Sequence, residues 1–195
     1  MKIISDNIIL RDMVETDIAD YVRWFTTETE WLDWDEPWDP IQTDDVTEQN
    51  RWTKCWMSAL VLSEESPRKR FEVEAEGRHI GCVLSYRVDE NFSWIPEEGI
   101  HAGQAAYTAI GIDICDPIMQ GKGYGTQAMK VFLQYLCSLG CKDLYVDTWS
   151  GNLRVIRMMN KTKFSLYRRI PERWTVRGKQ YDELIYRYIG CDKEG

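Results

Sequence analysis

The sequence predicts an α/β protein, with a mixed central sheet of about seven strands and helices on both faces. Two observations carry this prediction. Strand-like and helix-like runs alternate along much of the chain, which is typical of helices packed on a sheet. A glycine-rich segment, Gln120–Thr126, also stands between an apolar strand-like run and an amphipathic helix-like run, where a turn from strand to helix is expected.

The first half of the chain opens with a short strand at Ile8–Arg11. Thr16 or Asp17 then caps a helix that carries its apolar residues on one side. Residues 28–40, with two prolines, predict a loop, and residues 43–62 predict a second helix. Phe71–Ala75 alternates as a strand does, and a turn at 76–78 leads into a strand over 80–86.

The second half begins with a long acidic loop at residues 89–104. A strand over about 106–115, the glycine-rich segment and a helix to about Leu139 follow. Leu144–Val146 predicts the next strand, and residues 152–163 predict a helix with one apolar face. Two closing strands, at about 164–175 and 180–189, are joined by a turn at Arg177-Gly178.

Length and patterning indicate one folded unit. At 195 residues the chain can bury a sizeable core, and we expect a single domain over residues 1–195. No apolar run approaches the length of about 18 residues that a membrane span needs. The first residues also lack the apolar stretch of a signal peptide, so we expect a cytoplasmic protein with no membrane partner.

Cysteine and charge patterns narrow the function further. The six cysteines form no C-x-x-C pair, and the two histidines do not stand at zinc spacing from them, so we expect no metal and reduced cysteines. Cys82 and Cys115 lie in apolar runs and are expected in the core. Residues 1–150 carry 13 Lys and Arg against 27 Asp and Glu, while residues 151–195 carry 11 against 5. The acidic part argues against nucleic acid and suits a cationic ligand.

The glycine-rich segment exposes backbone N–H groups at the positive end of the following helix, where phosphate groups bind. A P-loop is excluded because Gly125 is not followed by Lys and then Ser or Thr. A dinucleotide fingerprint fits at two glycines but has Thr126 in place of the third, with Asp147 as a candidate ribose-binding acid. A tightly packed helix entry without a ligand is the structural alternative.

A third pattern, Gln-x-x-Gly-x-Gly, is met in full by Gln120, Gly123 and Gly125. This motif resembles the pyrophosphate loop of the GCN5-related N-acetyltransferases (GNAT). The order of the predicted elements is similar to the fold of that family over nearly the whole chain, most specifically at residues 106–164. The resemblance implies acetyl-CoA as co-substrate and a strand bulge that frees the N–H of Ile112 or Ile114 for the thioester carbonyl. The expected pyrophosphate-binding residues are Gln120, Gly121, Lys122, Gly123, Tyr124, Gly125 and Thr126.

A second stretch of the family, Asn-x-x-Ala-x-x-x-Tyr-x-Lys-x-Gly-Phe, has Asn152, Lys161 and Phe164 in place here. The resemblance implies that Asn152 hydrogen-bonds the pantetheine arm, with a plain helix cap as the alternative. Met159 stands where many members carry the tyrosine that protonates the departing thiolate. This departure leaves the general acid unassigned, and it keeps open a non-catalytic acyl-CoA-binding sensor.

Acetyl transfer needs a neutral amine, whereas an amine like that of Lys is protonated near pH 7. Alternation along 109–114 places Asp113 on the strand face opposite its isoleucines, where a carboxylate is costly unless it faces a cleft or a partner. Gly111-Ile112-Asp113 resembles the aminoglycoside 6'-N-acetyltransferases, which have an aspartate there and acids where Asp147 stands. We expect Asp113 to take the amine proton and Asp147 to bind the substrate. An ion-paired or solvent-facing Asp113 is the alternative.

Residues 28–49 contain nine acidic residues and no basic residue, with three interleaved tryptophans. Carboxylates beside aromatic faces suit a polycationic amine, and we expect Trp34 and Asp35 to bind it. Glu97, in the long acidic loop, is expected to add to the same site. A solvated acidic loop whose tryptophans cover the core is the structural alternative.

Together with the acidic, tryptophan-rich stretch, the resemblance implies an N-acetyltransferase that moves the acetyl group of acetyl-CoA to a primary amine of a cationic, aminoglycoside-like acceptor, with a role in antibiotic resistance. Residues 177–182 are also similar to ribosomal-protein and polyamine acetyltransferases, so a polyamine or a protein N-terminus is the alternative acceptor. The expected partner is a small cationic amine, and the chain is expected to be a monomer or a homodimer.

Overall fold

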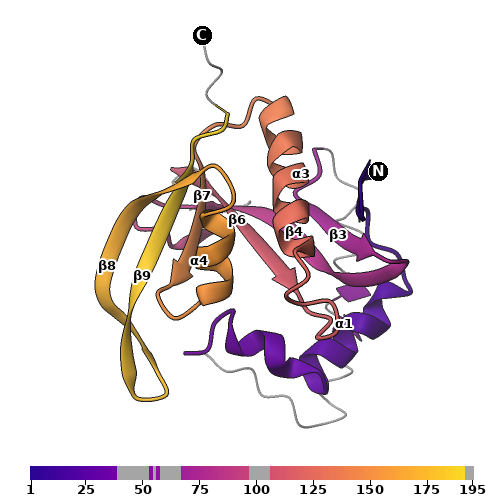
Figure 1. The fold of residues 1–195 in the computed structure, drawn as a ribbon, viewed down its shortest axis with the longest axis horizontal. Coiled ribbons are helices and arrows are strands. Elements are labelled where there is room, and N and C mark those ends of the chain that lie inside the picture. The colour runs from indigo at the N-terminus through magenta and orange to yellow at the C-terminus, as the bar shows by residue number, and fades with distance from the viewer. Residues whose placement is uncertain (39–52, 55, 58–66, 97–105, 192–195) are drawn as a thin grey trace. The chain divides into compact units, whose positions relative to one another are not determined.

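The structure is a computed structural model that describes residues 1–38, 53–54, 56–57, 67–96 and 106–191 (Figure 1). Most of the predicted helix at 43–62 lies outside the described residues, as does Glu97. Internal contacts divide the chain into two compact units. The first unit is Met1–Val83 with Ile112–Phe132, and the second is Leu84–Gly111 with Leu133–Gly195. The prediction of a single domain over residues 1–195 stays a prediction.

The strands follow the order β1-β2-β3-β4-β6-β7-β9-β8, with β5 on β4, and they include parallel and antiparallel pairs. The predicted mixed sheet with helices is confirmed, and the nine strands found among the described residues exceed the expected seven by β1 and the two-residue β5. The strands of the first unit are β1 (Lys2–Ser5), β2 (Ile8–Arg11), β3 (Arg70–Ala75), the first part of β4 (Arg78–Val88) and the last part of β6 (Tyr107–Ile114).

Two helices cover opposite faces of the strands in the first unit. Glu72 of β3 accepts a hydrogen bond from Tyr21 of α1 (Asp17–Thr26). Its neighbour Phe71 points the other way and meets Phe132 of α3 (Tyr124–Ser138), with 6.0 Å between ring centroids. Because successive side chains of a strand alternate, α1 and α3 must lie on different faces.

Strand β4 changes face at Gly81. His79 contacts the Tyr21 ring with 5.3 Å between centroids, and Cys82 also interacts with the Tyr21 side chain. Residues three apart on a regular strand would face opposite ways. Gly81 between them has φ +149°, and a Cβ there would lie 1.8 Å from the carbonyl oxygen of Asp113. Because Gly81 has no side chain, the β6 backbone can approach β4 closely at this point. The unusual backbone conformation of Gly81 turns Cys82 to the α1 face.

The second unit holds the remaining parts of β4 and β6 together with a strand–helix–hairpin succession. β7 (Leu144–Trp149) pairs in parallel with β6 and antiparallel with β9 (Lys179–Tyr188), and α4 (Leu153–Met159) leads from β7 to β8 (Phe164–Val176). The long β8–β9 hairpin is visible in orange and yellow in Figure 1. Its turn is the predicted Arg177-Gly178, and both residues have positive φ, as a tight hairpin turn requires. A core around Phe92, Tyr145 and Ile185 holds the strands together.

Several expectations need correction. Thr16 makes no side-chain cap at α1; Asp17 accepts the hydrogen bond of the Val14 N–H instead. The predicted 152–163 helix ends at Met159. The cysteines were expected to be reduced, whereas Cys137 and Cys191 form a disulfide in the second unit. The two cysteines are 54 residues apart, and no pattern in the sequence predicts that they pair. Cys82 and Cys115 are buried, as predicted. Among the described residues, no helix is long and apolar enough to cross a membrane.

Candidate active site

The glycine-rich segment lies in the first unit and forms the turn between β6 and α3, as the sequence predicts. Gly121 and Gly123 have φ values of +74° and +93°, a backbone conformation that other residues adopt at a cost. Apart from the adjoining residues of the chain, no heavy atom of the described residues lies within 4 Å of the position that a Cβ would take at either glycine. Helix α3 begins at Tyr124, so an anion at this turn would meet free N–H groups and the positive end of a 15-residue helix. The turn therefore fits a pyrophosphate group.

The other residues of the segment have structural partners. The Gln120 side-chain amide donates to the Ile114 carbonyl over 2.9 Å and ties the segment back to β6. A Cβ at Gly125 would lie 3.3 Å from Cγ1 of Ile114, so this glycine lets α3 pack closely on the strand. The Tyr124 hydroxyl donates to Glu76, and Lys122 is exposed. Direct contacts of Gln120, Lys122 and Thr126 with the cofactor, and the roles of the Ile112 and Ile114 N–H groups, stay predictions.

Asp113 lies on the α1 face of β6, because Ile112 and Ile114 face α3. Its side chain is half-buried, and within the described residues its polar contact is with Cys82, whose Sγ lies 4.0 Å from Oδ2. Burial raises the pKa of Asp113 to about 6, against the opposing effect of Arg70 and with the support of the negative charge of Glu36. The carboxylate is thus mostly charged near pH 7 and able to accept a proton.

An arginine lies near Asp113 but is held by other groups. Arg70 forms an ion pair with Glu72 over 2.9 Å and donates to the hydroxyl of Tyr21. Its guanidinium also lies over the ring of Trp56, 4.8 Å from the centroid, and Trp56 stacks on Tyr21 at 3.9 Å. These contacts hold the positive charge in an aromatic wall. The ion-paired alternative for Asp113 finds no partner among the described residues.

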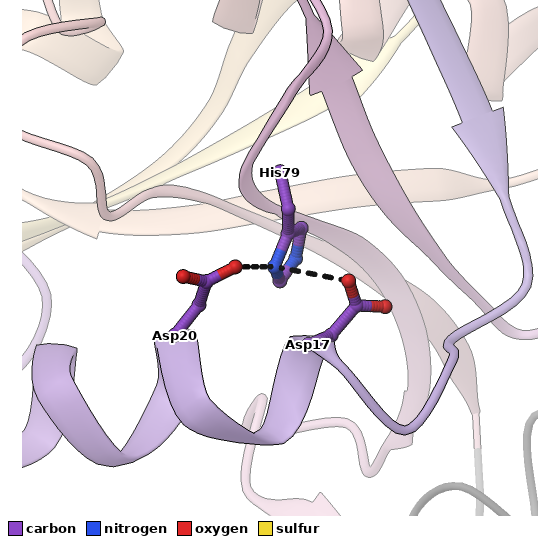
Figure 2. A group of neighbouring side chains, drawn as sticks. All are labelled: Asp17, Asp20 and His79. Carbon is purple, nitrogen blue, oxygen red and sulfur yellow. Dashed lines mark hydrogen bonds and ion pairs between the residues drawn. The ribbon is translucent and has the colours of Figure 1, made fainter.

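A second group of titratable residues in the first unit resembles a metal site in composition. Figure 2 shows Asp17 and Asp20 of α1 pointing toward the imidazole of His79. His79 Nδ1 lies 3.0 Å from Asp20 and 3.5 Å from Asp17, and Nε2 lies 2.9 Å from Glu72. Burial opposes a charge here, but the three carboxylates outweigh it and raise the pKa of His79 to about 9.

A doubly protonated imidazole has no lone pair to offer to a metal ion. Asp17, moreover, accepts two hydrogen bonds of 2.7 Å from the Arg11 guanidinium. The geometry therefore indicates an ion-pair network that fixes α1 to β3 and β4 rather than a cation site.

The tryptophan-rich stretch is described as far as Trp38. Trp31, in the 3-10 helix η1 (Thr29–Asp33), is buried, and its Nε1 donates to the Trp24 carbonyl over 2.9 Å. This residue belongs to the core. Trp34 is half-buried and Asp35 is exposed. Glu36, which the sequence analysis did not single out, is close enough to Asp113 to raise its pKa. The structure thus links this stretch to Asp113, and binding by Trp34 and Asp35 stays a prediction.

In the second unit, Asp147 lies on β7 and accepts a hydrogen bond of 3.0 Å from the hydroxyl of Tyr86 on β4. Burial raises the pKa of Asp147, while the Tyr86 hydrogen bond favours its charged form. Glu183 of β9 is a buried acid that the sequence analysis missed. Burial raises its pKa, and the negative charge of Asp147 raises it further. A single Glu in an alternating strand gives no signal of its own in the sequence.

Asn152 and Met159 begin and end α4. Asn152 is the N-cap, and its Oδ1 accepts from the Val155 N–H over 3.1 Å, so the helix-cap alternative is realised. A contact with the pantetheine arm stays a prediction. Met159 is fully buried, so it is a core residue of the second unit. The general acid is not found at this position.

Comparison with known proteins agrees with this geometry. The profile of the acetyltransferase (GNAT) domain matches residues 7–165. A ribosomal-protein-S5-alanine acetyltransferase from Vibrio fischeri is similar in structure, with a TM-score of 0.70, 16% identity and all of both chains covered. The RimL ribosomal L7/L12 α-N-protein acetyltransferase in complex with CoA gives a TM-score of 0.69 at 16% identity, with 96% of this chain and 97% of that chain covered.

YncA from Salmonella typhimurium, a putative acetyltransferase with bound acetyl-CoA, gives a TM-score of 0.65 at 15% identity, with 93% of each chain covered. Identities this low show a shared fold. No curated protein matches the sequence. The family match spans most of the chain and includes the glycine-rich turn, whose open N–H groups fit the cofactor. The chain therefore belongs to the GNAT acetyltransferase family and is an acetyl-CoA-dependent N-acetyltransferase.

Proposed function

We propose that this enzyme acetylates a primary amine of a small cationic acceptor of the aminoglycoside class. The observation that carries the proposal is Asp113, a half-buried carboxylate on the α1 face of β6 with a pKa near 6. A base with this pKa is charged near pH 7, yet it can still take a proton from an ammonium group. The cluster of acidic residues and tryptophans that includes Trp34, Asp35 and Glu36 supports a cationic acceptor.

Each residue has a defined task in this proposal. Acetyl-CoA supplies the acetyl thioester, and the N–H groups of residues 121–126 hold its pyrophosphate. Asp113 removes the proton from the acceptor ammonium, so that the neutral nitrogen can attack the thioester carbonyl. The C–S bond then breaks, CoA leaves as its thiolate, and the new amide nitrogen gives up its extra proton to water. Asn152 binds the pantetheine arm, and Asp147 attracts the positive charge of the acceptor.

A protein N-terminus is the second candidate acceptor. The ribosomal-protein acetyltransferases that share the fold, at TM-scores of 0.69 and 0.70, favour it. The two acceptors differ in charge, because an aminoglycoside carries several ammonium groups whereas a protein N-terminus carries one α-amine, of lower pKa.

A thiol-release assay with acetyl-CoA separates the candidates. The panel contains an aminoglycoside, a polyamine, and peptides with the N-termini of ribosomal proteins. Release that is fastest with the aminoglycoside, together with a Km that rises with salt, agrees with the proposal. Release with the peptides alone would replace it by the second candidate. Absence of release with every amine would contradict both.

A further inference from the structure

Arg70 of β3 lies in the first unit, on the same face of the sheet as Asp113, and the proposed transfer of the acetyl group does not use it. Glu72 bonds to α1 from two residues further along β3, so Arg70 faces α1 as well. Its guanidinium is close enough to Asp113 and to the thiol of Cys82 to lower the pKa of both, against the larger effect of burial. The Sγ of Cys82 lies 4.0 Å from Oδ2 of Asp113. Arg70 is therefore a neighbour of the proposed base.

Two of the three guanidinium nitrogens of Arg70 are used by the protein. Nε donates to Glu72 over 2.9 Å, and Nη2 donates to the hydroxyl of Tyr21. Within the part of the chain that the structure describes, Nη1 makes no hydrogen bond. The side chain is 20% exposed, so most of it is shielded from water while part remains accessible. Nη1 thus offers two N–H donors to a ligand.

Arg11, an arginine of similar burial in the same unit, has a complete set of partners. Its side chain is 15% exposed, and Nε donates to Glu74 over 3.0 Å. Nη1 and Nη2 each donate to an oxygen of Asp17 over 2.7 Å. The first unit can therefore satisfy every nitrogen of a guanidinium that only holds the fold together. The incomplete set at Arg70 needs another explanation, and a bound ligand supplies one.

Aromatic rings hold the guanidinium of Arg70 in one orientation. It lies 4.8 Å from the ring centroid of Trp56 and 5.2 Å from that of Tyr21, and these two rings stack on each other at 3.9 Å. A planar guanidinium fixed in this way presents its N–H groups in defined directions, whereas an ammonium group on a flexible chain does not. The position of Nη1 is thus set before a ligand binds.

The charges around Arg70 decide which group its free donors suit. Glu72 compensates the positive charge of the guanidinium, and Asp113 and Glu36 add negative charge to the same site. A carboxylate on the acceptor would be repelled by these acids. A protonated amine has no lone pair for an N–H donor. A neutral oxygen of a hydroxyl, ether or carbonyl group accepts the hydrogen bond without either penalty.

We propose that Arg70 is a specificity-determining residue that donates a hydrogen bond to a neutral oxygen of the acceptor, close to the amine that is acetylated. The inference rests on the proposed function and makes it narrower. Amino sugars carry hydroxyl and ring oxygens next to their amino groups, and a peptide carries its first carbonyl oxygen there. Linear polyamines carry no oxygen, so Arg70 selects against them.

The test compares tetrahydrofurfurylamine with cyclopentylmethylamine, two primary amines of the same shape that differ by a ring oxygen in place of a methylene group. The quantity measured by thiol release is the kcat/Km for the oxygen amine divided by that for the carbon amine. Arg70→Lys keeps the charge and loses the planar fork, so this ratio should fall about tenfold, the effect of losing one hydrogen bond to a charged group. The different basicity of the two amines cancels when ratios of enzyme variants are compared.

Arg11→Lys is the matched control, because it makes the same substitution at an arginine whose nitrogens are all used in the fold. It should leave the ratio unchanged. A merely structural role of Arg70 would lower the activity with both amines alike, so a ratio in Arg70→Lys equal to that of wild type would overturn the proposal. An equal fall of the ratio in Arg11→Lys would overturn it too.

Calorimetry covers the cases in which the ratio is not measurable. If Arg70→Lys does not fold, as judged by its melting curve, the affinities of CoA-bound wild type for the two amines at pH 7, where both are protonated, decide the question. Tighter binding of tetrahydrofurfurylamine would support the role of Arg70, and equal binding would contradict it. If wild type acetylates no amine at all, the proposed function is wrong, and the same binding comparison then tests Arg70 separately. It applies equally if neither of these two amines is a substrate.

Discussion

The pKa of Asp113 predicts the pH dependence of the reaction. A base acts in its deprotonated form, and burial raises the pKa of this carboxyl from 3.8 to about 6. About nine-tenths of the enzyme is then active at pH 7 and about one-tenth at pH 5. The kcat/Km of wild-type enzyme should therefore fall tenfold for each pH unit below 6. An ordinary surface aspartate would give no such loss until about pH 4.

Two substitutions give the prediction its magnitude. Asp113→Asn keeps the shape of the side chain and removes the base, so kcat should fall about 10²- to 10⁴-fold and the inflection near pH 6 should disappear. Glu36→Gln removes a negative charge that raises the pKa of Asp113, so the inflection should move to lower pH while the rate at pH 8 stays within a few-fold.

The measurement is thiol release at saturating acetyl-CoA over pH 5 to 9, with calorimetry of CoA binding as the control for the fold and for the cofactor site. The acceptor amine loses its own proton at much higher pH, which separates its titration from that of Asp113. An inflection near pH 6 that persists in Asp113→Asn would assign it to another group. Activity of Asp113→Asn within a few-fold of wild type would refute the role of Asp113 as the general base.

Three other predictions concern the first unit. Gly123→Asp should weaken CoA binding measured by calorimetry far more than Gly123→Asn, because both strain the backbone at φ +93° but Asp alone repels the pyrophosphate; equal losses would reject the anion site. His79 should stay protonated to about pH 9. Since its pKa rises on folding, its stabilisation, at most about 3 kcal/mol, is complete below pH 6.5 and lost as the pH rises through 9. An imidazole NMR titration with the midpoint of His79 near 6.5 would contradict this. Trp34→Ala should lower acceptor affinity a few-fold to about thirty-fold at unchanged melting temperature, and Asp35→Asn should reduce its salt dependence; a lower melting temperature with unchanged affinity would instead make Trp34 a core residue.

The parts of the fold that follow local rules could be predicted from the sequence. The strand–turn–helix at the glycine-rich segment depends on neighbouring residues, and so does the turn at Arg177-Gly178. Strand β1 was missed because four residues at the chain start carry too little pattern, and they form a strand only by pairing with β2. The two-residue β5 likewise depends on β4.

In the candidate site, likewise, only the residues that a local sequence pattern marks could be predicted. Asp113 could be singled out because a charge interrupts an apolar alternating strand. Glu183 has no such signal, since its burial depends on β7 and β8 on either side of its strand. The network around His79 also joins residues far apart in the chain. A histidine and two aspartates suggest a metal site by composition, and only the distances to Glu72 and Arg11 show that their lone pairs and protons are already used.

Asp113 and Asp147 are the same residue type on neighbouring strands, but the structure gives them different environments. Both are buried enough to have a raised pKa. Asp147 accepts a hydrogen bond from Tyr86, which favours its anion, whereas Asp113 faces only the weak thiol of Cys82 within the described residues. A carboxylate without a donor binds a proton more readily, and one with a donor keeps its charge. This difference supports our proposal of proton removal by Asp113 and cation binding by Asp147. Tyr86→Phe, which removes the hydrogen bond to Asp147, should raise the pKa of Asp147 and weaken acceptor binding without lowering kcat.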